Sequence, residues 1–185
     1  ENFSTTSDET KSNFNTWIQG DYNDSNYFED LDQCLDDLSA DKPEIDYKIT
    51  NDDDALYIYT SGTTGNPKAA TISHKRLRLM MLGFKGAIQP NKNDRVYNVL
   101  PLYHSAGGVI AVGLALTSGA SLVLKRKFSV NEFWDDVHKY KVTIFQYIGE
   151  LCRYLLNAPF HKYEKDHNLR MVTGNGLRPD IWDDF

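Results

Sequence analysis

Cysteine is scarce in this sequence of 185 residues, which contains only Cys34 and Cys152. The two lie far apart and form no Cys-x-x-Cys pair or Cys/His cluster, so neither a disulfide framework nor a zinc site is indicated, as a reducing compartment would permit. Long apolar runs are also missing: none reaches membrane-spanning length, and the first residues do not form a signal peptide. Because Glu1 stands in place of a starting methionine, we expect an internal piece of a longer protein.

Charge of the two signs is unevenly distributed along the chain. Residues 1–55 hold 16 acidic and 3 basic residues, whereas residues 56–185 hold 10 acidic and 17 basic, for a net charge of −6 overall. We interpret the acidic part as a solvated lead-in. The basic part suits an anionic ligand, but its cations are scattered rather than striped, which argues against nucleic-acid binding.

The hydrophobic pattern divides the chain at residue 54. Residues 1–54 are expected to be an acidic polar lead-in with one amphipathic helix over 27–38. Beyond it, strands are predicted at 55–59, 69–72, 96–100, 121–124, 142–147 and 170–173. Helices are predicted between Ser73 and Pro90, over 107–117, after a capping box at 129–132, over 151–157, and from Pro179 onward. This alternation predicts an α/β fold with a largely parallel sheet and helices on both faces.

The stretch Tyr57–Lys68 has the composition of a loop that wraps phosphate. Gly62 and Gly65 let backbone N–H groups approach an anion closely. Hydroxyl donors come from Thr60, Ser61, Thr63 and Thr64, and Lys68 adds a point charge. The P-loop motif Gly-Lys-Ser/Thr is absent, and a glycine-rich surface turn is the alternative interpretation of the loop considered alone.

Two further loops are expected at the carboxyl ends of strands, where ligands gather on parallel sheets. They span residues 101–108, which include His104, and residues 174–177. A lone histidine after a strand is more often a structural hydrogen-bonding group. The three loops together nevertheless predict one site at one edge of the sheet.

The whole dodecamer Tyr57–Lys68 resembles the AMP-binding signature of the adenylate-forming superfamily. Residues 100–107, Leu-Pro-Leu-Tyr-His-Ser-Ala-Gly, are similar to that superfamily's second recognisable block. The segments 127–129, 133–136 and above all 146–156 narrow the resemblance to the fatty acid transport proteins, also called very-long-chain acyl-CoA synthetases. The resemblance covers residues 55–185 and hardly extends to residues 1–54.

This resemblance implies that residues 55–185 are part of the large N-terminal domain of an adenylate-forming enzyme, truncated on its C-terminal side. It implies ATP-dependent conversion of long-chain or very-long-chain fatty acids to acyl-CoA through an acyl-adenylate, linked to fatty acid uptake. Mg²⁺ and coenzyme A would take part, and this fragment alone would be inactive. Lys68 and His104 would be catalytic, residues Thr60, Ser61, Gly62, Thr63, Thr64, Gly65 and Lys68 would hold phosphates, and Gly174, Asn175 and Gly176 would lie along adenine. No metal ligand is assigned.

Partners implied by the resemblance are the fatty acid, ATP and coenzyme A, with membrane association through regions outside this chain. The expected location is the endoplasmic reticulum, with the plasma membrane and the peroxisome as alternatives, and the site is expected to face the cytosol. Two alternatives stay open. One is a fatty-acid transport or binding protein with little catalysis, and the other is adenylation of a different carboxylic acid.

Overall fold

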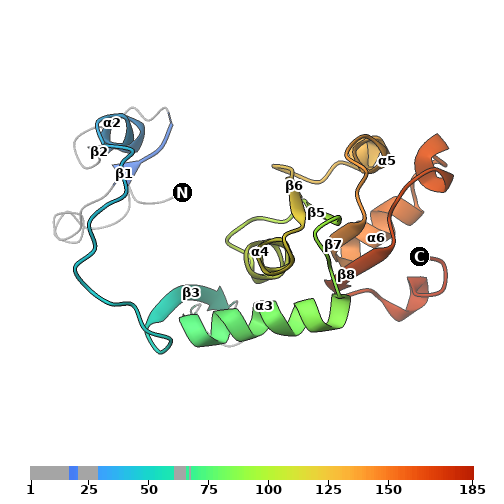
Figure 1. Cartoon of the computed structure of the whole chain (residues 1–185). Coiled ribbons are helices and arrows are strands. Elements are labelled where there is room, and N and C mark those ends of the chain that lie inside the picture. Colours follow the sequence, from blue (N-terminus) through green and yellow to red (C-terminus); the bar gives the residue numbers. More distant parts are fainter. Residues whose placement is uncertain (1–16, 21–28, 61–65, 67) are drawn as a thin grey trace. The chain divides into compact units, whose positions relative to one another are not determined.

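The computed structural model describes residues 17–20, 29–60, 66 and 68–185 (Figure 1). The chain divides into two compact units, Glu1–Lys48 and Ile49–Phe185. None of the described helices is both long and apolar enough to cross a bilayer.

The described part of the first unit is small. Strands β1 (Trp17–Ile18) and β2 (Glu29–Asp30) pair in parallel, and helix α2 (Leu31–Asp36) follows directly. The side chain of Asp30 caps this helix by accepting from the backbone N–H groups of Asp32 and Gln33, and no residue of α2 is buried. The helix is therefore shorter than the predicted range 27–38, of which residues 27 and 28 lie outside the described part.

The second unit holds an antiparallel hairpin and a parallel sheet. The hairpin consists of β3 (Asp54–Thr60) and β4 (Lys68–Ser73). The sheet has strands β5 (Arg95–Asn98), β6 (Ser121–Leu124), β7 (Ile144–Ile148) and β8 (Met171–Asn175) in the order β6-β5-β7-β8, and every neighbouring pair is parallel. The helical segments are α3 (His74–Ile88), the π-helix η2 (Ser105–Ala111), α4 (Val112–Ser118), α5 (Val130–Lys139), α6 (Gly149–Leu156), and the 3₁₀ turns η3 (Lys162–Lys165) and η4 (Pro179–Ile181).

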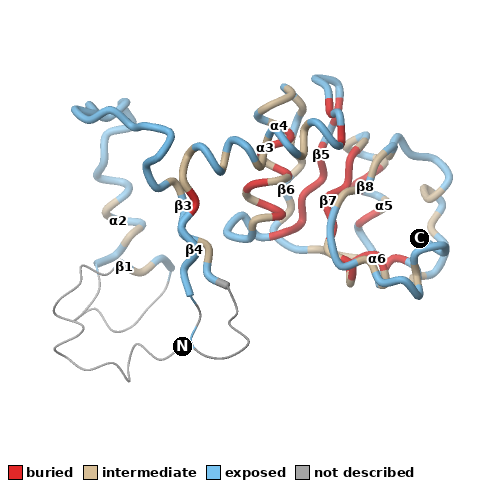
Figure 2. Tube along the Cα trace, turned by 90° about the horizontal axis from the view of Figure 1, so that it is seen from below, coloured by how far each residue is buried: buried red, intermediate tan, exposed pale blue. Residues whose placement is uncertain are grey.

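Alternate residues of the strands enter two apolar clusters on opposite faces of the sheet. Tyr97 and Phe145 pack with residues of α5 and α6, whereas Val96 and Ile144 pack with residues of α3 and α4. Figure 1 shows α3 and α4 on one side of the strands and α5 and α6 on the other. Figure 2 shows that burial concentrates in the two central strands, β5 and β7. The predicted α/β fold with helices on both faces is confirmed.

Helix α3 begins and ends as its sequence predicts. The Ser73 hydroxyl accepts a hydrogen bond from the backbone N–H of Arg76, and Gln89 ends the helix in the left-handed conformation just before Pro90. Gly119, with φ of 75°, ends α4 in the same way.

Two predictions about local structure are wrong, and a third holds with a different type of helix. Residues 69–72 form β4, the antiparallel partner of β3, so the phosphate-type loop belongs to a hairpin and not to the parallel sheet. The capping box at 129–132 does not form: the Ser129 side chain makes no cap bond, and the Glu132 carboxylate accepts from Lys125 Nζ at 3.3 Å. The single helix predicted over 107–117 is a π-helix followed by a short α-helix.

Candidate functional site

The hairpin β3–β4 fixes the two ends of the phosphate-type loop. Thr60 and Lys68 are direct partners in the antiparallel register, so both ends of the connecting segment are held at one rung of the ladder. The predicted phosphate-binding residues Ser61, Gly62, Thr63, Thr64 and Gly65 lie outside the described residues. Of this group, the structure thus places the backbone of Thr60 and the exposed Lys68.

His104 is the N-cap of the π-helix η2. Its backbone N–H donates to the carbonyl of Pro101 at 3.0 Å, and its Nδ1 accepts from the N–H of Ala106 at 3.1 Å. A neutral imidazole that accepts through Nδ1 carries its proton on Nε2. Since His104 is exposed, this Nε2–H is available as a donor at the carboxyl edge of the sheet.

A pocket of about 270 Å³ lies between β3 and the segment that carries His104. Its walls come from the hairpin on one side and from the loop and first turns of η2 on the other. The lining residues are Leu56, Tyr57, Ile58, Leu102, Tyr103, His104, Ser105, Gly108 and Val109. The pocket therefore joins the two sequence blocks that predicted the site, although neither Lys68 nor residues 174–176 line it.

Two glycines allow the close packing beside this pocket. A Cβ on Gly108 would stand 1.9 Å from the carbonyl oxygen of Leu102, and one on Gly107 would stand 2.5 Å from that of Pro101. Any larger residue would push the loop away from η2. The wide turns of the π-helix coincide with this glycine pair, and π-helical turns are frequent at functional sites.

The turn predicted to contact adenine lies at the C-terminal end of β8, at the carboxyl edge of the sheet. Gly174 and Asn175 are the last residues of β8, opposite Tyr147 and Ile148, and Gly176 follows with φ of 75°. A Cβ on Gly174 would lie 2.3 Å from the Tyr147 carbonyl oxygen. All three residues are exposed. Two of the three are glycines, so this exposed turn carries little side-chain bulk.

The sheet topology identifies where a ligand would bind at the carboxyl edge of the sheet. After β5 the chain crosses to β6 through η2 and α4 on one face, whereas after β7 it crosses to β8 through α6 on the other face. The neighbouring strands β5 and β7 therefore send their connections in opposite directions. Such a switch point is where open α/β sheets bind ligands. His104 follows β5 at this point, and residues 174–176 lie two strands away.

Sequence reasoning overlooked two polar residues at the switch point. Asn98 and Gln146 are completely buried and pair directly between β5 and β7. Asn98 is satisfied locally, because its side chain accepts from Leu100 N–H at 3.1 Å and donates to Leu100 O at 3.2 Å. The signal in the sequence is a glutamine inside the otherwise apolar and aromatic run of residues 144–148.

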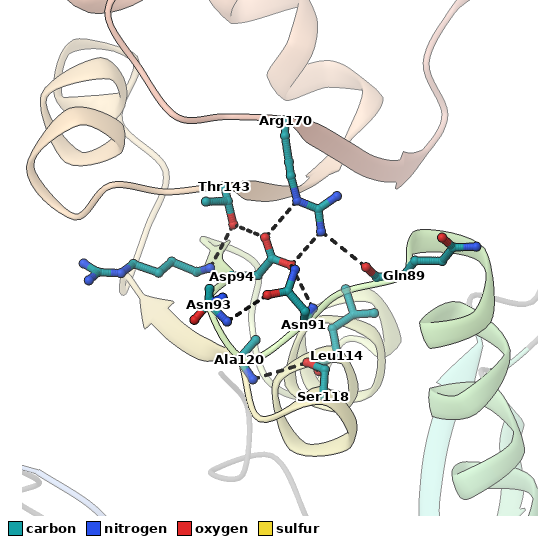
Figure 3. Close-up of polar contacts among 10 residues, drawn as sticks. Gln89, Asn91, Asn93, Asp94, Leu114, Ser118, Ala120, Thr143 and Arg170 are labelled. Carbon is teal, nitrogen blue, oxygen red and sulfur yellow. Dashed lines mark hydrogen bonds and ion pairs between the residues drawn. The ribbon is translucent and has the colours of Figure 1, made fainter.

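The opposite, amino-terminal edge of the sheet is fastened by Asp94 (Figure 3). Its carboxylate accepts from Arg170 Nη2 at 2.6 Å and Nε at 2.9 Å, and from the Thr143 hydroxyl at 2.7 Å. Asn91 donates two further hydrogen bonds through its backbone and its side chain. The bonds from Arg170, above all, lower the pKa of Asp94 to about 2. This network ties the starts of β5, β7 and β8 together.

A larger pocket of about 440 Å³ lies on the α5 and α6 side. Its lining is mainly apolar and includes Trp134, Leu155 and Phe160. None of the predicted site residues lines it. The switch point and the sequence blocks both favour the smaller pocket beside His104 as the functional one.

Comparison with known proteins identifies the relatives of this chain. The family model described as AMP-binding enzyme matches residues 5–185. Long-chain fatty acid transport protein 1 of Homo sapiens is 52% identical over 134 residues, which cover 72% of this chain and 21% of that protein. Medium/long-chain-fatty-acid–CoA ligase FadD6 of Mycobacterium tuberculosis is 42% identical over 158 residues, covering 85% of this chain and 26% of that protein. The chain thus spans about a fifth to a quarter of the length of the curated relatives it matches.

Solved structures agree on the fold. ATP-bound MatB from Rhodopseudomonas palustris is similar with a TM-score of 0.71 and 25% identity, over 83% of this chain and 30% of that one. The N-terminal domain of FACL13 from Mycobacterium tuberculosis has a TM-score of 0.71 and 22% identity, over 83% of this chain and 38% of that one. Part of the N-terminal domain of an adenylate-forming enzyme is therefore the fold present here.

Proposed function

The chain belongs to the AMP-binding enzyme family, and from that premise we propose that the protein activates long-chain or very-long-chain fatty acids with ATP. The fatty carboxylate attacks the α-phosphorus, pyrophosphate leaves, and the thiol of coenzyme A then displaces AMP from the acyl-adenylate. The observation that carries the proposal is the pocket in which His104 faces strand β3 of the signature hairpin. The names of the relatives, fatty acid transport protein and fatty-acid–CoA ligase, support the acid class and a link to uptake.

Charge neutralisation is the first task of such a site, because a carboxylate and a triphosphate repel each other. We assign the β- and γ-phosphates to residues 60–65 and to Lys68, which pairs with Thr60 at the loop end of the hairpin. Mg²⁺, when bound, would neutralise phosphate charge and keep several waters. In the described ranges no group of three or more His, Cys, Asp or Glu could hold a metal ion. Phosphate oxygens of the nucleotide would be among the ligands of Mg²⁺.

Positioning of the acid is the second task, and we assign it to His104. The Ala106 N–H fixes the ring through Nδ1, which directs the Nε2–H outward as a single oriented donor. One acyl carboxylate oxygen would accept from it. Gly174, Asn175 and Gly176 would lie along the adenine ring, where the absence of side chains at both glycines permits flat contact.

The decisive experiment is ATP–pyrophosphate exchange by the whole protein to which this chain belongs, with a very-long-chain fatty acid, with benzoate, and without acid. Exchange should require the fatty acid, and Lys68→Ala should raise the KM for ATP about tenfold or more, since it removes a charged contact to phosphate. Lys75→Ala is the matched control, because Lys75 is also an exposed lysine but belongs to α3 and not to the phosphate-type loop.

Each other outcome identifies an alternative. Exchange with benzoate instead of the fatty acid would indicate adenylation of another acid. Fatty-acid binding and uptake that survive Lys68→Ala, with no exchange under any condition, would indicate transport or binding without catalysis. Equal effects of Lys68→Ala and Lys75→Ala would remove Lys68 from the site.

The cellular setting is a proposal as well. We expect the whole protein at the endoplasmic reticulum, the plasma membrane or the peroxisome, with regions outside this chain making the membrane contact and the site facing the cytosol. Cell fractionation together with protease protection tests this. Exchange activity recovered only in the lumenal compartment would contradict it.

A further inference from the structure

Helix α6 begins directly against the turn that we assign to adenine. It follows β7 without a connecting loop, so Gly149 is at once the residue after the strand and the first residue of the helix. A Cβ on Gly149 would lie 1.6 Å from the carbonyl oxygen of Gly176, 2.1 Å from its carbonyl carbon and 2.7 Å from the backbone nitrogen of Leu177. The peptide group that joins Gly176 to Leu177 therefore packs on the bare backbone of Gly149, and any side chain there would displace it.

A second contact holds the other end of the turn. Gly174 lies opposite Tyr147 in the register of β7 and β8, and a Cβ on Gly174 would lie 2.6 Å from Cδ2 of the Tyr147 ring. Tyr147 is buried and belongs to the apolar cluster on the α5 and α6 side of the sheet. Residues 174–176 thus rest on a buried ring at one end and on the start of α6 at the other.

Charged side chains connect the same two segments. Within α6, Glu150 accepts a hydrogen bond from Arg153, and just after the turn Arg178 Nε donates to Asp180 Oδ1 at 2.9 Å. The hydrogen bond from Arg153 and, to a lesser extent, the charge of Arg178 lower the pKa of Glu150. The bond to Glu150 and, to a lesser extent, the charge of Asp180 raise the pKa of Arg153. Opposite charges therefore link the start of α6 to the segment that follows the turn.

The place of the turn matters because a base binds by contact over a face. Non-bonded atoms meet at about 3.5 Å, so a Cβ on Gly149 would force the turn and the helix apart by more than about 1 Å. A gap of that size removes a large part of the dispersion energy of a stacked ring. Residues 174–176 are all exposed, so a base can reach the surface that Gly149 supports.

We propose that Gly149 is a positioning residue for nucleotide binding, whose bare backbone sets the place at which residues 174–176 contact adenine. The proposal rests on the proposed function and adds to it a residue of α6 that touches no reactant itself. Phosphates and acid are assigned to other segments, residues 60–68 and His104. The effect of Gly149 is therefore confined to the adenosine half of ATP.

The test is Gly149→Ala in the whole protein, measured by equilibrium binding of ATP and of inorganic tripolyphosphate, which lacks adenosine. We expect the Kd for ATP to rise about tenfold or more, because a displacement of about 1 Å is enough for such a loss. The Kd for tripolyphosphate and the KM for the fatty acid should each change less than about twofold. Asp94→Asn, at the opposite edge of the sheet, is the control for a comparable loss of stability and should leave both Kd values within about twofold.

Charge reversal supplies a second test that keeps Gly149 in place, should Gly149→Ala fold poorly. The double variant Glu150→Arg with Arg153→Glu retains the pair within α6 but sets like charges against Arg178 and Asp180. We expect its Kd for ATP to rise about two- to fivefold, as exposed charge pairs allow. Adding Arg178→Glu and Asp180→Arg makes the charges opposite again and should recover the affinity.

Two results would overturn the inference and leave the proposed function intact. An unchanged Kd for ATP in folded Gly149→Ala would mean that nucleotide binding does not depend on the place of the turn. Equal losses of ATP and tripolyphosphate affinity would mean that the substitution damages the site as a whole. If the wild-type protein binds no ATP at all, the proposed function fails, and the role of Gly149 fails with it.

Discussion

Loss of the Asp94 carboxylate should weaken the sheet at its amino-terminal edge. In Asp94→Asn, the single amide oxygen cannot accept all the bonds that Arg170, Thr143 and Asn91 donate, and the new NH₂ group faces donors. Asp94 is 3% exposed, so water cannot replace the lost partners. The variant therefore combines a lost ion pair with buried donors that no longer have acceptors.

The size of the effect follows from the pKa. A shift from 3.8 to about 2 corresponds to about 2 kcal/mol of stabilisation by the charged form. Because the Arg170 side chain is 39% exposed, solvent screens part of this. Unsatisfied donors add a cost of similar size, and we expect Asp94→Asn to lower the free energy of unfolding by about 2–4 kcal/mol.

The same pKa fixes the direction of the pH dependence. The folded-state pKa lies below the unfolded value, so the carboxylate stabilises the fold fully above pH 4. That contribution declines as the pH falls through 3.8 and is lost below about 2. Wild type should therefore lose stability across this window more steeply than Asp94→Asn, whose residue 94 does not titrate.

Urea denaturation at pH 7 and thermal unfolding between pH 5 and pH 2.5 measure both effects. The matched control is Asp180→Asn, which breaks the exposed ion pair with Arg178, where Nε and Oδ1 are 2.9 Å apart. Exposed pairs contribute little, so this variant should unfold like wild type. If both variants unfold at the same urea concentration, the Asp94 network does not stabilise the amino-terminal edge of the sheet and the prediction is refuted.

Two further predictions concern close packing and thiol reactivity. Gly149→Ala would place a Cβ 1.6 Å from the carbonyl oxygen of Gly176 and should lower the free energy of unfolding by about 2–4 kcal/mol. Gly86→Ala, where a Cβ would meet no atom within 4 Å, should instead raise the free energy of unfolding by about 0.5–1 kcal/mol in the same denaturation assay. Equal effects of the two variants would contradict the close packing of Gly149. Cys152 is fully buried and burial raises the pKa of its thiol to about 11, so at pH 8 a disulfide reagent such as DTNB should react promptly with Cys34 alone and with Cys152 only after denaturant is added. Prompt release of two equivalents without denaturant would show that α6 opens readily.

The parallel sheet was predictable because its signals are local. Apolar strands separated by helices with recognisable ends specify a βαβ order, and Ser73 and Gly119 end up at the helix termini that their residue types predict. Pairing partners are not local in this way. Residues 69–72 have the same apolar character whether they join the main sheet or fold back on β3, and the sequence alone did not distinguish the two.

The other predictions that differ from the structure concern the start of α5 and the type of helix at η2. Both depend on contacts with residues outside the helix. Glu132 satisfies the capping-box pattern, but Lys125 takes its carboxylate. The π-helix depends on how closely Gly107 and Gly108 approach the carbonyl groups of the preceding loop, which no periodicity predicts. For the site, the histidine block and the signature stretch Tyr57–Lys68 were recognisable from their residues. The buried row of Asn98, Gln146 and Thr173 becomes visible only once the strand register is known.

The two edges of the sheet divide stability and ligand recognition between them, and paired variants can demonstrate this. At the amino-terminal edge, every oxygen of Asp94 has donors, so Asp94→Asn should lower the free energy of unfolding while leaving the KM for ATP within about twofold. At the carboxyl edge, His104 is exposed and its ring makes one hydrogen bond, from Ala106 N–H, so His104→Ala should slow exchange with little loss of stability. Because Asp94 and His104 lie at opposite edges of the sheet and share no partner, their effects on the free energy of unfolding should add in the double variant. Destabilisation by both single variants, with activity falling in parallel, would mean that His104 holds the loop as a structural residue and does not position the acid.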